Sequence, residues 1–129
     1  MITIIEQIYL DRGINMSRKK ASFKDYEGSK QNDKHIRKTE NMMLSDNYLK
    51  LSNSAKVVYD YMKLWACGNL EFQYAKSLAE KYMNGKTFLK AKDELIEKGF
   101  IEYVSGNRFA HIPNTYKFSS KWKFYKPKK

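Results

Sequence analysis

Two stretches of the chain place apolar side chains at helical spacing. Ser54–Ala66 follows a cluster of helix N-cap residues, Leu51-Ser52-Asn53-Ser54, and predicts a helix with Lys56, Asp60 and Lys63 outward. Its predicted inward face consists of Ala55, Val58, Met62, Trp65 and Ala66. Lys86–Lys98 predicts another, with Phe88, Ala91 and Leu95 inward and Lys86, Lys90, Asp93 and Glu97 outward. Lys92 falls at the edge of the inward face, where a lysine must extend its ammonium group to water. Gly68-Asn69 and Gly99 are expected to end the two helices.

Shorter elements surround these helices. A short element is expected over Met42–Leu49 and a short helix over Ala75–Tyr82. Met83-Asn84-Gly85 is expected to be a tight turn, because Asn and Gly tolerate the left-handed conformation. Strands are predicted at Leu70–Phe72, Phe100–Val104 and Thr115–Phe118, the last two joined by a turn over Ser105–Arg108. This order predicts an α+β fold of the winged helix-turn-helix type, with three helices, a short strand and a two-stranded wing.

Specific residues in these elements resemble a known group of proteins. They are Leu51-Ser52-x-x-Ala55-Lys56-Val57-Val58, Thr87-Phe88-x-x-Ala91, Leu95-Ile96-Glu97-Lys98-Gly99-Phe100-Ile101 and Asn114–Trp122. Over residues 44–122 the chain is similar to winged helix DNA-binding proteins of Gram-positive mobile elements. The resemblance implies a helix that enters the major groove and a wing that touches the backbone or minor groove. It also implies a role in plasmid replication, conjugative transfer or transcription regulation; Lys92, usually aliphatic in such helices, departs from the pattern.

Positive charge is concentrated at the two ends of the chain. The net charge is +11, from 25 Lys/Arg and 14 Asp/Glu. Residues 17–38 hold eight basic and three acidic residues, and Lys117–Lys129 holds six lysines and no acid. The sequence therefore predicts an N-terminal segment and flexible basic arm over 1–40, a winged helix domain over 41–122 and a basic tail over 123–129. For Trp122, packing on the domain is expected.

The sequence offers no constellation for catalysis or metal binding. His111 has no carboxylate partner nearby, and the six glycines are scattered singly rather than forming a phosphate loop. Two distant histidines and one cysteine do not make a zinc site, so no enzyme, metal or cofactor is predicted. Cys67 is expected to be a buried structural thiol. A lone cysteine, with no apolar run near the roughly 18 residues of a membrane span, favours a cytoplasmic protein that does not bind membranes.

The candidate DNA-binding residues lie in three places. The turn before the third helix (Lys86–Lys98) supplies Asn84 and Gly85, and the first turns of that helix supply Lys86, Thr87, Lys90 and Asp93. The backbone N–H groups at Asn84 and Gly85 suit a phosphate, and the outward side chains suit base edges. Arg108, at the hairpin tip, is placed to enter a narrow minor groove. Lys121 and Lys123 are expected to add contacts that do not depend on base sequence.

Double-stranded DNA is the predicted partner, with a relaxase or replication protein beside it. The sequence does not determine the oligomeric state, and a homodimer is one of the alternatives. An alternative is an RNA- or ribosome-associated winged helix protein, whose nucleic-acid complex would not survive excess tRNA. Another is a protein-interaction winged helix, which would retard no nucleic acid at moderate salt.

The first fifteen residues raise a separate question. Asp11–Asn15 permits codons that contain a ribosome-binding sequence just before Met16. Translation from Met16 is one hypothesis, and an amphipathic helix Ile2–Leu10 that packs on the domain is the other. The intact mass of the natively expressed protein separates them.

Overall fold

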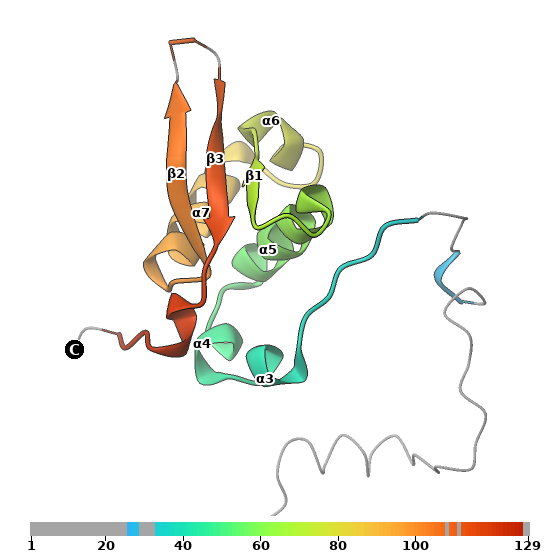
Figure 1. The fold of residues 1–129 in the computed structure, drawn as a ribbon, viewed down its shortest axis with the longest axis vertical. Helices are drawn as coiled ribbons and strands as arrows, with labels where there is room; N and C mark the ends of the chain where they lie inside the picture. Colours follow the sequence, from blue (N-terminus) through green and yellow to red (C-terminus); the bar gives the residue numbers. More distant parts are fainter. Residues whose placement is uncertain (1–25, 29–32, 108, 111, 128–129) are drawn as a thin grey trace, which may run out of the picture. The chain divides into compact units, whose positions relative to one another are not determined.

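The computed structural model describes residues 26–28, 33–107, 109–110 and 112–127. Two compact units divide the chain, Met1–Asp33 and Lys34–Lys129. In the first, Tyr26 and Glu27 are helical, and Gly28 has a positive φ of 66°. Ile2–Leu10, Met16 and most of the basic arm lie outside the described residues. The second unit contains the α+β domain (Figure 1).

The first long helix, α5 (Asn53–Ala66), begins where its capping residue predicts. The Ser52 hydroxyl accepts a hydrogen bond from the backbone N–H of Ala55 at 3.1 Å. The backbone N–H of Ser52 also donates to a carboxylate oxygen of Glu94 at 2.8 Å, which ties the start of α5 to another helix. Cys67 ends α5 in the left-handed conformation with φ 51°, and Gly68 follows at φ 87°. The predicted helix and its end are confirmed to within one residue.

The second long helix, α7 (Gly85–Glu97), follows the short α6 (Lys76–Ala79), which is shorter than the predicted Ala75–Tyr82. The prediction of left-handed residues in Met83-Asn84-Gly85 is wrong. Asn84 is extended, with φ −64° and ψ 142°, and its side chain caps the helix by accepting from the backbone N–H of Lys86. Gly85 is the first helical residue, so this turn is a helix cap rather than a left-handed bend.

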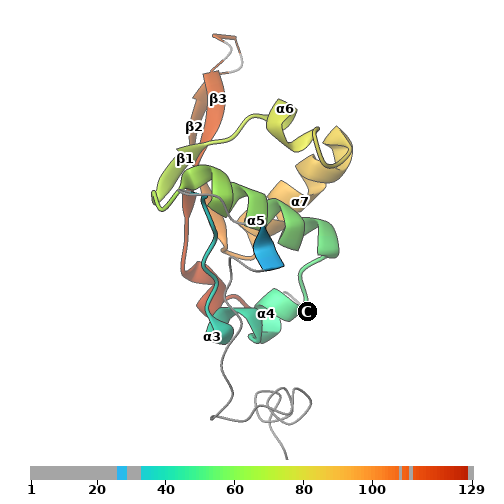
Figure 2. The ribbon, with the colours of Figure 1, turned by 90° about the vertical axis from the view of Figure 1, so that its right-hand side faces the viewer.

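An antiparallel three-stranded sheet completes the domain. Its strands are β1 (Glu71–Gln73), β2 (Ile101–Asn107) and β3 (Ile112–Phe118), in the order β1-β3-β2. Phe72 pairs with Tyr116, and Ile101 pairs with Phe118. The sheet lies on one side of the unit, and α5, α6 and α7 lie on the other (Figure 2).

The hairpin of β2 and β3 is longer than the sequence predicts. Ser105, Gly106 and Asn107 belong to β2 rather than to a turn. Pairing continues through them because the register shifts between Tyr103 and Ser105 and again between Ser105 and Asn107. A Ser-Gly-Asn sequence that is typical of a turn is therefore accommodated inside a strand.

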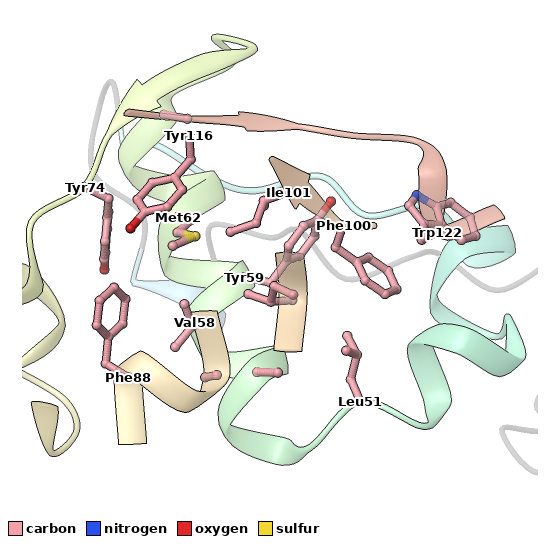
Figure 3. Packing of buried hydrophobic residues seen from close by; sticks show 14 of the residues in the cluster. Leu51, Val58, Tyr59, Met62, Tyr74, Phe88, Phe100, Ile101, Tyr116 and Trp122 are labelled. Atoms are coloured by element: carbon pink, nitrogen blue, oxygen red, sulfur yellow. The ribbon is translucent and has the colours of Figure 1, made fainter. Parts of the chain in front are cut away.

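The core lies between the helices and the inner face of the sheet (Figure 3). Its largest fully buried side chains include Tyr116, Phe88, Phe100, Met62, Leu95 and Ile101. The predicted inward residues of α7 are confirmed. In α5, Trp65 is 54% exposed and Tyr59 is 3% exposed, so that part of the prediction is wrong. The buried face of α5 widens toward Tyr59 because Phe100 and Phe118 contact its ring from the sheet side.

A small layer closes the end of the core near Gly99. It consists of α3 (Glu40–Met43), α4 (Asp46–Leu49) and the 3-10 helix η1 (Lys121–Lys123). The Trp122 ring stacks on Phe100 with centroids 5.7 Å apart and planes 4° apart, as its predicted packing requires. The Asn47 amide donates to the backbone oxygens of Trp122 and Tyr125. These contacts attach part of the predicted basic tail to the domain.

Residues just before α3 also pack on the domain. The compact unit starts at Lys34, within the segment that the sequence assigns to the arm. The Lys38 ammonium lies 2.6 Å from a carboxylate oxygen of Asp60 and donates to the Tyr48 hydroxyl at 2.8 Å. Burial alone lowers the pKa of Lys38, but these two partners outweigh it and the pKa is raised. Asp60 is thus an ion-pair partner rather than a residue of a purely solvated face.

Gly99 offers a stability test with an internal control. Its φ is 84°, and a Cβ there would lie 2.7 Å from backbone atoms of Lys121 and Trp122. Gly68 has a similar φ of 87° but no atom near its Cβ position. We expect Gly68→Ala to cost about 1–2 kcal/mol, from the left-handed conformation alone. Gly99→Ala should cost clearly more, because η1 must also move. Denaturant midpoints measure the difference. Equal losses of stability in the two variants would mean that η1 shifts away from residue 99 without a free-energy cost.

Candidate nucleic-acid interface

The N-terminal half of α7 presents a polar face to solvent. Lys86, Lys90 and Asp93 are exposed, and Thr87 is half-buried. The opposite face is fixed in the core by Phe88, which is 1% exposed, and Leu95, which is fully buried. Burial of this apolar face determines the rotation of the helix, so the two lysines are held outward by packing on the other side. The predicted helix phase is confirmed.

The start of α7 is more positive than the sequence indicates. A Cβ on Gly85 would overlap the end of the Lys76 side chain, with the Lys76 Nζ 3.3 Å away. The ammonium group of Lys76 therefore lies beside the positive end of the α7 dipole. The backbone N–H of Lys86 is bonded to the Asn84 side chain. The predicted phosphate donors are the N–H groups of Asn84 and Gly85, and their role stays a prediction. Lys76 is a candidate phosphate contact that sequence reasoning missed, because its proximity to Gly85 depends on how α6 packs on α7.

The middle of α7 meets the sheet. The Lys92 ammonium pairs with Asp93 at 3.2 Å, and its side chain is largely covered, as its predicted position at the edge of the core implies. The pKa of Tyr116 is raised, mainly by burial; the Asn114 hydrogen bond and the charge of Lys92 act in the opposite direction. The charge of Asp93 raises the pKa of Tyr116, so the Lys92 and Asp93 side chains both lie close enough to this tyrosine of β3 to act on it electrostatically. The Tyr116 ring also contacts Tyr103 of β2, which is half exposed. The middle of α7, at Lys92 and Asp93, therefore lies near Tyr116 of β3.

The hairpin presents apolar and aromatic side chains. Tyr103 is 53% exposed, Val104 44% and Ile112 48%. Phe109, near the tip, is 95% exposed. Arg108 and His111 lie outside the described residues. The predicted minor-groove contact of Arg108 therefore stays a prediction, and Phe109 is a neighbouring exposed residue that the sequence did not single out.

Lys121 and Lys123 belong to a different part of the domain. Both are in η1, whose backbone lies against Gly99 at the C-terminal end of α7, whereas Lys86 lies at the N-terminal end. A helix of 13 residues is about 20 Å long, so the two groups are well separated. The Lys121 ammonium pairs with Glu102 at 2.8 Å. This hydrogen bond and charge hold the pKa of the Glu102 carboxyl below its usual value.

Other candidate chemistry is sparse in the described part of the chain. Cys67 is exposed, so the prediction of a buried thiol is wrong; the left-handed residue that ends α5 lies at the surface. Within the described ranges, no three His, Cys, Asp or Glu side chains are grouped so as to hold a metal ion. None of the helices that the structure describes is long and apolar enough to cross a bilayer.

The geometry is thus an exposed basic face on the N-terminal half of α7, with a second basic site about one helix length away. Lys86, Lys90 and Asp93 share the first of these surfaces, and Lys121 and Lys123 share the second. Comparison with protein-family models, with curated proteins and with solved structures finds no significant match to this chain.

Proposed function

We propose that residues 34–129 form a winged helix-turn-helix domain that binds double-stranded DNA in a sequence-specific way. In this proposal α5, α6 and α7 are the three helices, and β2 and β3 are the wing. The elements follow one another as α5, β1, α6, α7, β2 and β3, and the sheet order is β1-β3-β2. The net charge of +11 favours a polyanionic partner.

The exposed N-terminal half of α7 is the observation that carries the proposal. Recognition helices of helix-turn-helix proteins contact base edges with their N-terminal residues. Here those residues are Lys86, Thr87 and Lys90, with Lys76 next to the helix start. Lysines donate to the O6 and N7 acceptors of guanine, which lie in the major groove. In this proposal the hairpin contacts the DNA backbone or the adjacent minor groove.

The biological setting follows from the resemblance to mobile-element proteins. We propose an accessory factor of replication or conjugative transfer, or a regulator, that acts beside a relaxase or a replication protein. The genes next to this one discriminate among these roles. A relaxase gene favours transfer, and a replicase gene favours replication.

Selection from random duplexes tests the proposal directly. The full chain is incubated with a random duplex pool, bound molecules are amplified, and the enriched site is titrated against a scrambled duplex at one salt concentration. We expect the enriched site to bind at least about tenfold more tightly and to survive excess tRNA. A pool that does not converge contradicts sequence-specific DNA binding. Binding that excess tRNA removes also contradicts it and favours the RNA-associated alternative.

The η1 lysines are expected to add affinity without sequence preference. Deletion of residues 121–129 is a poor test because it also removes Trp122 from the core. Lys123→Gln retains Trp122 and removes one exposed charge, the ammonium that lies 5.9 Å from the centroid of the Trp122 ring. Binding to selected and scrambled duplexes should weaken equally, and the slope of log K against log salt should fall by about 0.9 if one phosphate contact is lost. A loss confined to the selected site would instead show that Lys123 reads bases.

A further inference from the structure

An aromatic pocket lies between α5, the β1–α6 connection and the segment just before α7. Its volume is about 540 Å³, within the range of small-molecule sites. Four aromatic side chains line it, together with Leu64 and Leu78: Tyr61, Trp65, Tyr74 and Tyr82. Tyr61 and Tyr82 stack with centroids 4.1 Å apart, and Trp65 meets Tyr74 edge to face. Trp65 is 54% exposed and Tyr61 43%, so these rings have unoccupied surface.

The charged residues that line this pocket are both lysines. Lys34 and Lys81 line it, and none of the other described lining residues is acidic. Neither lysine forms an ion pair with a described residue. An aromatic cluster with no lysine nearby would suit a cation, whereas two unpaired ammonium groups repel one. Charge complementarity therefore favours an anionic occupant, and it disfavours a second copy of this basic chain.

The pocket also holds a pair of hydrogen-bonded phenols. The hydroxyls of Tyr74 and Tyr82 lie 2.6 Å apart, and either can be the donor. Burial raises the pKa of Tyr74, and burial together with the Tyr74 hydrogen bond raises the pKa of Tyr82, so both phenols keep their protons at neutral pH. Two protonated hydroxyls that share one hydrogen bond retain one hydrogen to donate to another acceptor.

We propose that this pocket binds a small planar aromatic anion, whose ring packs on Trp65 and Tyr61 and whose acidic group lies between Lys34 and Lys81. The inference does not depend on DNA binding, because no residue of the polar α7 face lines the pocket. The occupant is defined by two chemical features. It has a flat ring system that apolar and aromatic side chains cover, and a carboxylate, sulfonate or phosphate group that reaches the two ammonium groups.

Two dyes that differ by a single charged group provide the test. 8-Anilinonaphthalene-1-sulfonate and N-phenyl-1-naphthylamine share one ring system, and only the first has a sulfonate. Each dye is titrated by fluorescence against the full chain without DNA. We expect the sulfonated dye to bind about fivefold more tightly, from two partly exposed ion pairs. Equal affinities would overturn the proposal and leave an apolar pocket without selectivity for anions.

Variants of the lining residues locate the binding. Combining Lys34→Gln and Lys81→Gln should weaken the sulfonated dye about fivefold and leave the neutral dye unchanged. Trp65→Ala should weaken both dyes about tenfold, because it removes a ring surface. Lys50→Gln is the matched control, since Lys50 is exposed and lies outside the pocket. If Lys50→Gln weakens the sulfonated dye as much as the double variant, or if tetramethylammonium displaces it, the proposal is wrong.

Discussion

Phe100→Ala is expected to lower the free energy of unfolding by about 3–5 kcal/mol, the usual cost of truncating a buried phenylalanine. Phe100 is fully buried at the junction of the end of α7, the start of β2 and the closing layer. Its ring contacts three others, with centroids 6.0 Å from Tyr48, 5.8 Å from Tyr59 and 5.7 Å from Trp122. The truncation therefore leaves a cavity between elements from both ends of the domain.

Chemical denaturation followed by circular dichroism measures this loss. Phe124→Ala provides the matched control, because Phe124 is 82% exposed and its truncation should change the stability by less than about 0.5 kcal/mol. If Phe100→Ala and Phe124→Ala have the same free energy of unfolding, then η1 and α4 do not pack on Phe100 in solution. The closing layer would then be independent of the core.

The parts of the fold that sequence reasoning predicted are those with a long local signal. In α7, thirteen residues alternate between faces with helical period, so the inward Phe88 and Leu95 and the outward Lys86 and Lys90 follow from spacing alone. The cap at Ser52 and the left-handed Gly99 are equally local. Each is a property of a few consecutive residues, which is why each could be predicted without tertiary information.

The errors share a tertiary origin. Trp65 and Tyr59 both lie near the apolar stripe of α5, and only the position of the sheet determines which of them is buried. The Ser105–Asn107 segment is typical of a turn, but pairing with β3 extends the strand through it. The predicted basic tail is attached at Tyr125, whose backbone oxygen accepts a hydrogen bond from Asn47, 78 residues distant along the chain. Long-range contacts of this kind leave no spacing signature in the sequence.

In the candidate site too, some residue positions follow from local spacing and others depend on tertiary packing. The exposed lysines of α7 could be predicted, because the buried face of the helix fixes them. The separation of Lys121 and Lys123 from them could not be predicted, because it depends on where η1 packs. Lys76 was missed for the same reason, since its ammonium group reaches Gly85 only in the folded domain. The candidate residues of α7 and those of η1 therefore lie on two separate basic surfaces, and Lys76 joins the first of them.

Lys90→Ala is expected to reduce discrimination between the selected duplex and a scrambled one by about tenfold or more. A side chain that hydrogen-bonds a base edge contributes about 1–3 kcal/mol of discrimination, whereas one that touches only phosphate weakens binding to all sequences equally. Lys90 is exposed on the outward face of α7, one turn after Lys86, so its replacement should not disturb the core. Lys86→Ala should give a similar loss, and unchanged thermal melting should show that both variants remain folded.

The ratio of the two affinities separates base contacts from phosphate contacts within one protein. Lys90→Ala should change the ratio, and Lys123→Ala should lower both affinities while the ratio stays constant, because Lys123 lies at the far end of α7. Both titrations use one salt concentration, since salt alone changes every affinity. If the ratio is unchanged in both the Lys86 and the Lys90 variants, α7 does not read bases. The domain would then bind nucleic acid only through its charge, and specific recognition by this helix would be excluded.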